Sequence, residues 1–334
     1  MKLSRCMRAR TMLGLPLLVS MAALGATPAA GPLRVGTVNP RYFVDPDGRP
    51  VYLTGSHTWQ SLQDGILSGY TVVTQPFDYV GYLDLLQKNH HNFIRLWRWE
   101  LATHEPQPWQ RTGPGPALDG KPKFDLRQFH QAYFDRLRSR VIAARDRGIY
   151  VSIMLFEDWI FMNKRQEYPV EQHPFHRDNN ISGINGDLNG DGWGIEIHTL
   201  QVPQVLEIQK AYVHKVVETV NDLDNVLYEI CNEGLRHTRE WQYEMVRFVK
   251  SIEGKMPKQH PVGMTSVGDM NDDCLKSPAD WTSLATTGFE RPQDPWTSDP
   301  PAADGHKVCL LDTDHIGWKV FMDDAAFTRA WVWK

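Results

Sequence analysis

The sequence has few cysteines, no strong excess of charge of one sign, and no long apolar run beyond its N-terminal segment. Its 334 residues include 36 lysines and arginines and 40 aspartates and glutamates, a formal net charge of −4. This near balance argues against a protein that binds nucleic acid by neutralising phosphates. No later segment reaches the roughly eighteen consecutive apolar residues of a membrane helix, so no membrane span is expected.

Cysteine is too scarce for a disulfide-stapled fold. One of the four cysteines, Cys6, lies in the leader described below, which leaves Cys231, Cys274 and Cys309. An odd number of cysteines cannot pair completely. Two interpretations stay open: buried free thiols, or one disulfide with a spare thiol.

The N-terminus has the order of charge and hydrophobicity of a secretory signal. Basic residues within the first ten positions precede an apolar run at 12–26, and the small residues of 27–30 follow. That order is typical of a signal peptide, here covering residues 1–30. We therefore expect an exported protein, periplasmic or extracellular, whose residues 31–334 form one large domain.

Short apolar runs alternate with amphipathic segments along the rest of the chain. A hairpin is expected at 42–53, and the expected strands cover residues 51–54, 93–99, 149–156, 226–231, 261–267, 281–285 and 308–311. Helices are expected to begin at Pro76 and at Asp125, and to cover 203–223, 241–254 and 327–333. Asp125 is the expected N-cap of its helix, with Gln128 placed to complete a capping box.

Strands that alternate with helices form a parallel sheet with right-handed crossovers. Seven such units predict an α/β fold, a (β/α)8 TIM barrel, and no Gly-x-Gly-x-x-Gly follows the first strand to favour a dinucleotide-binding sheet. Only nineteen residues follow His315, which suffice for one helix but not for a helix and an eighth strand. We expect either a chain truncated before the final strand or a final strand supplied by another segment.

The active site of such a barrel lies at the carboxyl ends of its strands. The residues expected there are rich in carboxylates and aromatic rings: His57, Trp59, Arg95, Trp97, Arg98, Trp99, Glu100, Glu157, Asp158, Trp159, Asn232, Glu233, Asp269, Asn271, Asp312, Asp314 and His315. Glycoside hydrolysis requires two carboxylates that face each other, one as proton donor and one as nucleophile or base. The pattern therefore predicts a carbohydrate substrate and requires no cofactor.

Side-chain alternation selects one pair of carboxylates. Glu233 shares a face with Cys231 on the fourth strand, and Asp312 shares a face with Leu310 on the seventh. If these are the inner faces, the two carboxylates oppose each other across the barrel mouth. Arg95 on the second strand would then keep one carboxylate ionised by lowering its pKa, while the other stays protonated in an apolar setting.

Three stretches resemble a known clan of enzymes. Tyr228–Glu233 is similar to the Asn-Glu signature on strand four of the retaining (β/α)8 glycoside hydrolases that include cellulases and β-mannanases. Asn92–Arg95 resembles the strand-two arginine motif of that clan. The segment Phe43–Gly55 resembles its entry into strand one, including that of the apiosidase-like branch.

The resemblance implies a role for each matching residue. Glu233 matches the acid/base, Asn232 the side chain that hydrogen-bonds the sugar 2-hydroxyl, and Arg95 the arginine that steadies the nucleophile. Asp312 falls where the clan has a nucleophilic glutamate, and Asp314 is the alternative partner. Because aspartate is one methylene shorter, the carboxylate separation can exceed the roughly 5 Å of a retaining enzyme.

Further residues are expected to contact the sugar. The tryptophans Trp59, Trp97, Trp99 and Trp159 would form a stacking platform, and Trp193 would join it from the long polar loop at 180–198. The remaining expected substrate contacts are His57, Glu157, Asp158 and His315.

Each assignment has an alternative. Glu233 would otherwise cap the following helix, and Asp312 and Asp314 would bind backbone amides at a helix start. Glu229 precedes Glu233 by four residues on the same face of the strand, lower in the barrel, and is expected to be structural.

Two other functions stay open. A metal-dependent hydrolase would use His57 and His315 with the aspartates of strand seven as ligands. A carbohydrate-binding barrel without catalysis would follow if the change of nucleophile to aspartate abolished turnover.

The loop at 187–192 fits the first half of a calcium-binding loop, with Asp187, Asn189 and Asp191 at alternate positions. The twelfth position is His198 rather than glutamate, so the bidentate ligand is missing. Either the cluster is a rigid polar turn, or it holds a structural Ca²⁺ that orders the loop.

Overall fold

The computed structural model describes residues 27–68, 71–73, 76–162, 169–265, 267–285 and 307–312. At its centre is a parallel sheet whose strands, in spatial order, are β13 (Val308–Cys309), β12 (Trp281–Ser283), β11 (Val262–Thr265), β10 (Val226–Asn232), β9 (Tyr150–Glu157) and β6 (Phe93–Leu96). Chain order and spatial order agree throughout, as the predicted barrel requires. Residues 1–26 of the expected signal peptide (1–30) and the expected helix at 327–333 lie outside the described residues.

The first barrel strand is shorter and later than expected. Parallel bridges join Gly55 to Phe93 and Thr58 to Leu96, which places 55–58 beside β6. A side chain at position 55 would collide with the backbone of β6, because an added Cβ would lie 1.7 Å from the Phe93 carbonyl oxygen. Glycine is therefore what lets the first strand approach the second.

The prediction of a strand at 51–54 was wrong. Val51 belongs instead to β3 (Pro50–Val51), which pairs with β2 (Phe43–Val44) in a small antiparallel sheet that β1 (Arg34–Val35) completes. The side chain of Asn92 accepts from the Thr54 N–H and donates to the Tyr52 carbonyl oxygen, both at 2.9 Å. These bonds satisfy backbone groups between the hairpin and the barrel that would otherwise pair with a neighbouring strand. The hairpin itself is confirmed.

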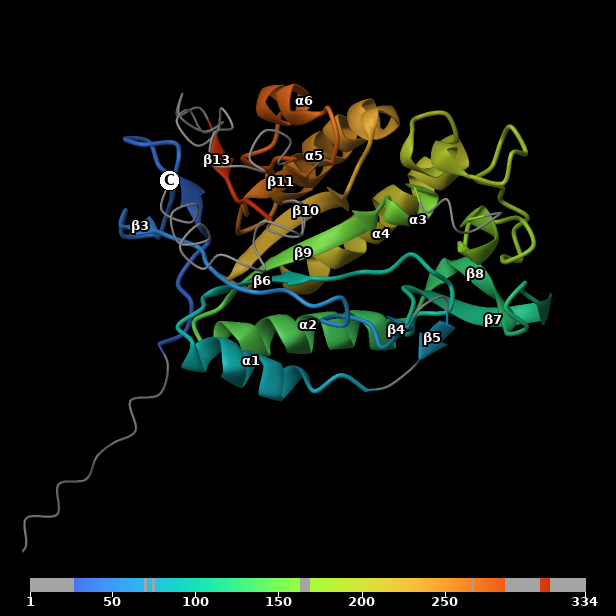
Figure 1. Cartoon of the computed structure of the whole chain (residues 1–334), viewed down its shortest axis with the longest axis horizontal. Helices are drawn as coiled ribbons and strands as arrows, with labels where there is room; N and C mark the ends of the chain where they lie inside the picture. The colour runs from blue at the N-terminus through green and yellow to red at the C-terminus, as the bar shows by residue number, and fades with distance from the viewer. Residues whose placement is uncertain are drawn as a thin grey trace, which may run out of the picture.

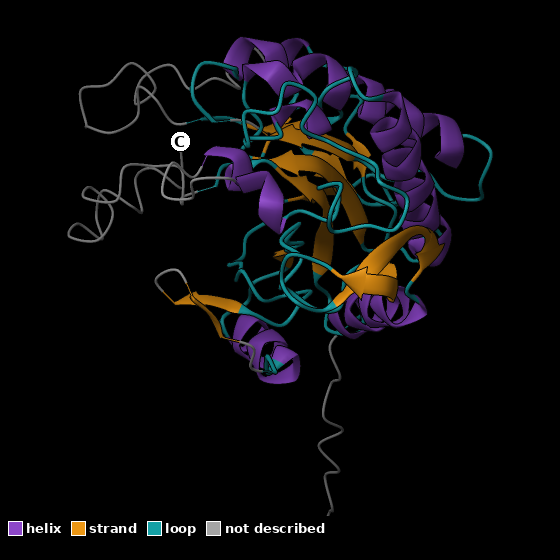
Figure 2. Cartoon of the chain, turned by 90° about the vertical axis from the view of Figure 1, so that its right-hand side faces the viewer, coloured by secondary structure: helices purple, strands orange, loops and turns teal. Residues whose placement is uncertain are grey.

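Helices connect successive strands and surround the sheet, as Figure 2 shows. The connecting helices are α1 (Tyr79–Lys88), α2 (Gln131–Arg145), α4 (Pro203–Val220), α5 (Arg239–Glu253) and α6 (Asn271–Lys276). Every residue of β9 and β10 is buried, as expected for strands covered on both faces. Helix α4 starts with proline in its first turn and buries a valine stripe against these strands.

The prediction of a helix beginning at Asp125 was wrong. Residues Pro122–Phe129 form β8, which pairs with β7 (Trp109–Pro116), and α2 starts only at Gln131. The Asp125 carboxylate accepts from the Arg127 N–H and the Gln128 side-chain amide, a local turn rather than a helix cap. Pairing with β7 outweighs the capping pattern.

The carboxyl ends of the strands lie on the side of α3 (Trp159–Met162), which follows β9 directly (Figure 1). The hairpin β7–β8 lies on the same side of the molecule. The long connection after α3 contributes two short 3-10 helices, η1 (Pro169–Gln172) and η2 (Ile195–His198). A third, η3 (Arg236–Thr238), leads from β10 into α5. These segments shape the mouth of the barrel.

The last residues assigned to the leader contact the domain. The Ala29 N–H donates to the Arg145 carbonyl oxygen at 2.9 Å, and the Tyr150 hydroxyl donates to the Ala30 carbonyl oxygen at 2.5 Å. A chain that began at Gly31 would therefore lack both contacts.

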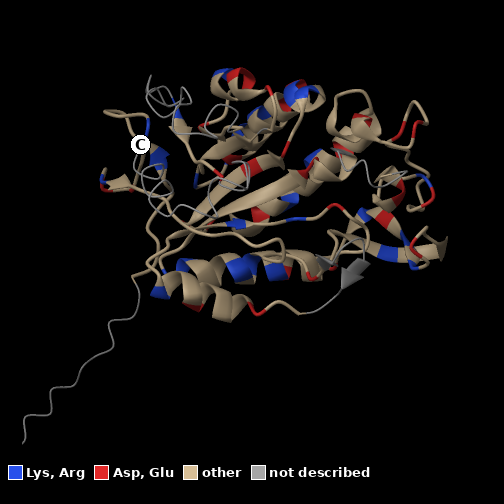
Figure 3. Ribbon diagram, in the orientation of Figure 1, with Lys and Arg blue, Asp and Glu red and all other residues tan. Residues whose placement is uncertain are grey.

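Acidic and basic residues are interspersed along the helices (Figure 3). No helix in the part of the chain that the structure describes is both long and apolar enough to cross a membrane.

Candidate active site

Arg95, on β6, lies at the centre of the site. Its guanidinium donates to both carboxylate oxygens of Glu229 at 2.9 and 2.5 Å, to Asn232 Oδ1 at 2.7 Å and to Asp312 Oδ2 at 2.5 Å. Burial alone would lower the pKa of Arg95, but the charges of Glu229 and Asp312 outweigh burial and hold it above its usual value. A single permanent cation therefore joins the ends of the second, fourth and seventh strands.

Glu229 lies below this cation, where the sequence analysis places a structural residue. Its side chain is fully buried, and it also accepts from the hydroxyl of Thr265 at 3.2 Å. Glu229 accepts from Nε and Nη2 of Arg95 and so fixes the orientation of the guanidinium. Nη2 donates to Asn232 as well, and Nη1 donates to Asp312.

Glu233 follows Asn232 directly and has a left-handed backbone, with φ 51°. For a residue other than glycine this conformation costs about 1–3 kcal/mol and is held only where the surroundings require it. The N-cap residues of the next helices are Leu235 and Thr238, so Glu233 does not occupy a capping position. Its side chain is half-buried.

Glu157, at the end of β9, is a buried carboxyl group beside the Asn-Glu pair. It is in register with Asn232, its Oε1 accepts from the Trp159 N–H at 2.5 Å, and its Oε2 has no hydrogen-bond partner in the part of the chain that the structure describes. Burial, and then the nearby charge of Glu233, raises the pKa of Glu157 well above its usual value. The group therefore retains a proton at a pH where ordinary glutamates are ionised.

A deeper network lies behind these residues. His198 Nδ1 is 2.8 Å from Asp158 Oδ1, and its Nε2 is 3.0 Å from Glu100 Oε2. Arg98 pairs with Glu100 at 3.3 Å, and all four side chains are fully buried. Burial would lower the pKa of His198, but the two carboxylates outweigh it and raise the pKa to about 9. The imidazole is therefore a cation between two anions.

Sequence reasoning placed Asp158 among the substrate contacts and listed Glu100 at the strand ends without a role, whereas it considered His198 only as a position of the calcium-like loop. The structure buries Asp158, where histidine and backbone partners engage its oxygens. A histidine and a glutamate that are 98 positions apart carry no local signal of their contact. The only hint was that Glu100 follows a predicted barrel strand.

The predicted aromatic platform is a continuous row of rings. His57 stacks on Trp97 with ring centres 5.4 Å apart, Trp97 lies 5.8 Å from Trp99, and Trp99 meets Trp159 edge-on at 5.9 Å. Trp59 packs on Trp97 at 6.5 Å and remains 42 % exposed, whereas Trp97 and Trp99 are buried. The exposed ring of Trp59 is thus the part of the row that solvent reaches most.

The turn at 187–192 is bonded within itself. The two oxygens of Asp187 accept from the Gly190 and Gly192 N–H groups, Asn189 accepts from the Asp191 N–H, and Asp191 accepts from the half-buried Trp193. Across the described ranges, no three histidine, cysteine or carboxylate side chains are arranged to hold a metal ion. The calcium interpretation stays a prediction.

Two of the expected rim residues bond elsewhere: Asp269 accepts from Arg236 at 2.6 Å, and Asn271 donates to the Ala285 carbonyl oxygen at 2.8 Å. Asp314 and His315 lie outside the described residues. Cys231 and Cys274 are buried and Cys309 is partly buried.

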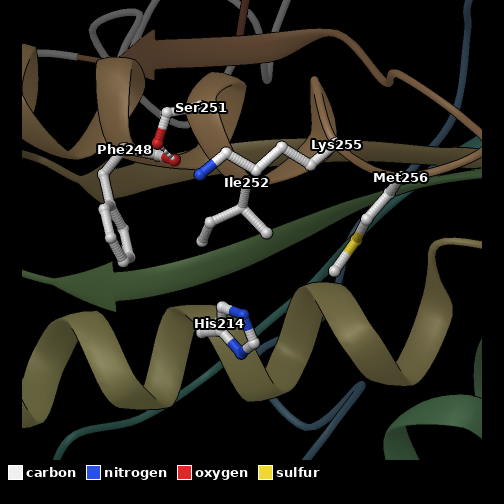
Figure 4. A pocket seen from close by; sticks show the side chains of 6 residues that line it. All are labelled: His214, Phe248, Ser251, Ile252, Lys255 and Met256. Carbon is white, nitrogen blue, oxygen red and sulfur yellow. Dashed lines mark hydrogen bonds between the residues drawn. The ribbon is translucent and has the colours of Figure 1, made fainter.

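A groove on the outer helices is lined by none of these site residues. Figure 4 shows its lining side chains. The groove has a volume of about 310 Å³ and lies between α4 and α5, lined by His214, Phe248, Ser251, Ile252, Lys255 and Met256. None of these residues is a carboxylate or follows a barrel strand, so the groove offers no pair of acids for the predicted chemistry.

Comparison with solved structures establishes the fold. The chain resembles a family 5 glycoside hydrolase from Bacteroides vulgatus (TM-score 0.50, 15 % identity, 86 % of this chain and 55 % of that one). It also resembles the family 5 mannosidase of Rhizomucor miehei (0.53, 16 %, 86 % and 73 %) and an endo-1,4-β-D-mannanase from Thermotoga petrophila (0.53, 14 %, 84 % and 84 %). It covers 47 % of a second Bacteroides vulgatus structure.

A scan with models of protein families finds no match, and a search of curated protein sequences finds none. The likeness to solved structures and the parallel sheet confirm the predicted α/β fold of (β/α)8 type.

Proposed function

We propose that the protein is an exported glycoside hydrolase that acts on a β-linked polysaccharide or oligosaccharide. The observation that carries the proposal is the position of Arg95, which binds Asn232 and Asp312 at once beside the left-handed turn at Glu233. Two carboxylates and one amide are thus gathered at the mouth of a barrel whose structural neighbours include mannanases. The likeness of fold supports this class without identifying the sugar.

In the proposed mechanism Glu233 donates a proton to the glycosidic oxygen as the bond from that oxygen to the anomeric carbon breaks. Asp312, ionised beside Arg95, either attacks the anomeric carbon or takes a proton from the attacking water. In the first case one water molecule then attacks the anomeric carbon, the bond from that carbon to Asp312 breaks, and Glu233 accepts the proton of the water. Asp314 is the alternative partner carboxylate.

Unpartnered buried polar atoms also support a hydroxyl-rich ligand. Asn232 Nδ2, Trp97 Nε1 and Glu157 Oε2 are buried in this region and have no hydrogen-bond partner among the described residues. Such groups are costly to leave unsatisfied. Sugar hydroxyls both donate and accept, so a sugar can serve all three atoms, with Asn232 bonding the 2-hydroxyl.

The test is hydrolysis by the full chain of a panel of β-1,4-mannan, β-1,4-glucan and other plant polysaccharides, followed as release of reducing ends. Glu233→Gln should lower the rate by about 10²–10⁴-fold while retaining oligosaccharide binding. The matched control is Glu218→Gln on the exposed face of α4, which should leave the rate unchanged.

Binding without turnover in the wild-type chain would instead establish a carbohydrate-binding barrel. If the wild-type chain neither binds nor hydrolyses any of these polymers, the proposal is overturned.

A further inference from the structure

The residue that follows Glu157 holds the backbone on both sides of Glu233. The Asp158 N–H donates to the Asn232 carbonyl oxygen at 3.0 Å, directly before Glu233. The Asp158 Oδ2 accepts from the Leu235 N–H at 3.3 Å, two residues after Glu233. Asp158 is therefore bonded to the chain before and after the proposed acid/base residue.

The turn so held is tightly packed. An added Cβ at Gly234 would lie 2.2 Å from Gln242 Nε2 and 2.8 Å from Thr238 Oγ1. Thr238 Oγ1 also donates to the Leu235 carbonyl oxygen at 2.7 Å. The turn thus has no room to relax toward α5, and Asp158 fixes it on the side of β9.

The carboxylate of Asp158 is itself fixed from two further elements. His198 of η2 bonds its Oδ1 at 2.8 Å, and His237 of η3 approaches the same oxygen at 3.3 Å. The His198 ring stacks on Trp241 of α5 at 4.6 Å, and its other nitrogen bonds Glu100. A continuous chain of charge-assisted bonds therefore runs from Glu100 through His198 and Asp158 to the Leu235 N–H.

We propose that Asp158, held by His198, is a positioning residue that keeps the strained turn at Glu233 in the geometry for proton donation. The inference rests on the proposed function, because it gives Glu233 the role of acid/base. A fully buried, fully bonded Asp158 acts through the backbone of the turn rather than on the substrate. Displacing a catalytic group by about 1 Å can cost 10²-fold in rate.

The test compares two aryl glycosides of the sugar that the wild-type chain cleaves, one with a 2,4-dinitrophenol and one with a 4-methoxyphenol leaving group. Dinitrophenolate departs without protonation, whereas methoxyphenolate needs the proton of Glu233. We expect Asp158→Ala to lower kcat/KM about 10²-fold on the methoxyphenyl glycoside and less than about 3-fold on the dinitrophenyl glycoside. A general loss of folded protein would lower both equally.

Asp158→Asn is the conservative variant. Its carboxamide oxygen can still accept from the Leu235 N–H, so activity on the methoxyphenyl glycoside should be partly restored relative to Asp158→Ala. If Asp158→Ala fails to fold, the rates on the two glycosides are compared in Asp158→Asn and His237→Gln instead. The matched control is Asp78→Asn, since Asp78 also accepts from a backbone N–H, that of Gly81, but at the exposed start of α1.

Hydrogen exchange gives an independent readout, because the Leu235 amide should exchange faster in Asp158→Ala than in the wild type. Equal losses on both glycosides, or an unchanged Leu235 exchange rate, would overturn the positioning role and leave the hydrolase assignment intact. A wild-type chain that cleaves neither glycoside nor any polysaccharide would overturn both.

Discussion

Arg95 Nη1 lies 2.5 Å from Asp312 Oδ2, and these residues are 217 positions apart in the sequence. The contact brings the end of the seventh parallel strand to the second. It is this pairing that keeps Asp312 beside a permanent cation and gives the mouth of the barrel a defined arrangement of charge.

Removing the cation should destabilise the fold as well as abolish activity. Arg95→Met leaves Glu229 and Asp312, both largely buried, without their partner. We expect a loss of about 3–5 kcal/mol in the free energy of unfolding, measured by urea titration. Arg138→Met is the control, because its pair with Asp222 is solvent-exposed and worth about 1 kcal/mol or less. Similar losses in the two variants would show that Arg95 is not the centre of the site.

Asp312→Asn separates charge from shape. The carboxamide oxygen can still accept from Arg95, so the fold should persist, as far-UV circular dichroism would show. Without the negative charge the hydrolysis rate should fall by about 10³-fold or more. Retention of the full rate would transfer the role of the second carboxylate to Asp314, whose own Asn variant would then be the inactive one.

Glu157→Gln should stabilise the protein at neutral pH. The folded-state pKa of Glu157 is raised by burial, so its ionisation in the unfolded chain favours unfolding once the pH exceeds its ordinary value of 4.5. Glutamine cannot ionise, and its oxygen can still accept from the Trp159 N–H. We expect a gain of about 1–3 kcal/mol at pH 7.5 that disappears near pH 4, measured by thermal melts. A variant less stable than the wild type at pH 7.5 would contradict the raised pKa.

His198→Gln should be most destabilising at low pH. The folded-state pKa of His198 is raised to about 9 from an ordinary value of 6.5. Its contribution to stability is therefore complete below pH 6.5 and is lost as the pH rises through 9. The difference in unfolding free energy between wild type and variant should be on the order of 3 kcal/mol larger at pH 5.5 than at pH 9.5. His214→Gln, on the exposed face of α4, is the matched histidine variant for comparison.

Local patterns predicted most of the barrel. The apolar run of β9 and the apolar stripe of α5, which ends before Gly254, could be predicted because buried positions recur with a fixed period on a strand or helix. The same patterns failed at Asp125, where a capping signature lies within a strand. There, pairing with a distant partner strand decides the structure, and no local rule contains that partner.

The site divides in the same way. The meeting of Arg95, Asn232 and Asp312 follows from topology, since parallel strands end at one side of a barrel. The bonds from His198 to Asp158 and Glu100 depend on the path of a long irregular connection. Such a path has no periodicity, so the contacts among these residues could not be predicted from the sequence.

The left-handed backbone at Glu233 also bears on how this gene can change with time. Glycine would adopt that conformation without steric cost, so a chain freed from the need for a carboxylate could gain stability by exchanging Glu233 for glycine, a change of one nucleotide in either glutamate codon. Under the proposed function, loss of activity should therefore begin at position 233, with a protein that folds better without this carboxylate. Retention of glutamate at position 233 is then expected only where the proposed reaction outweighs that gain in stability.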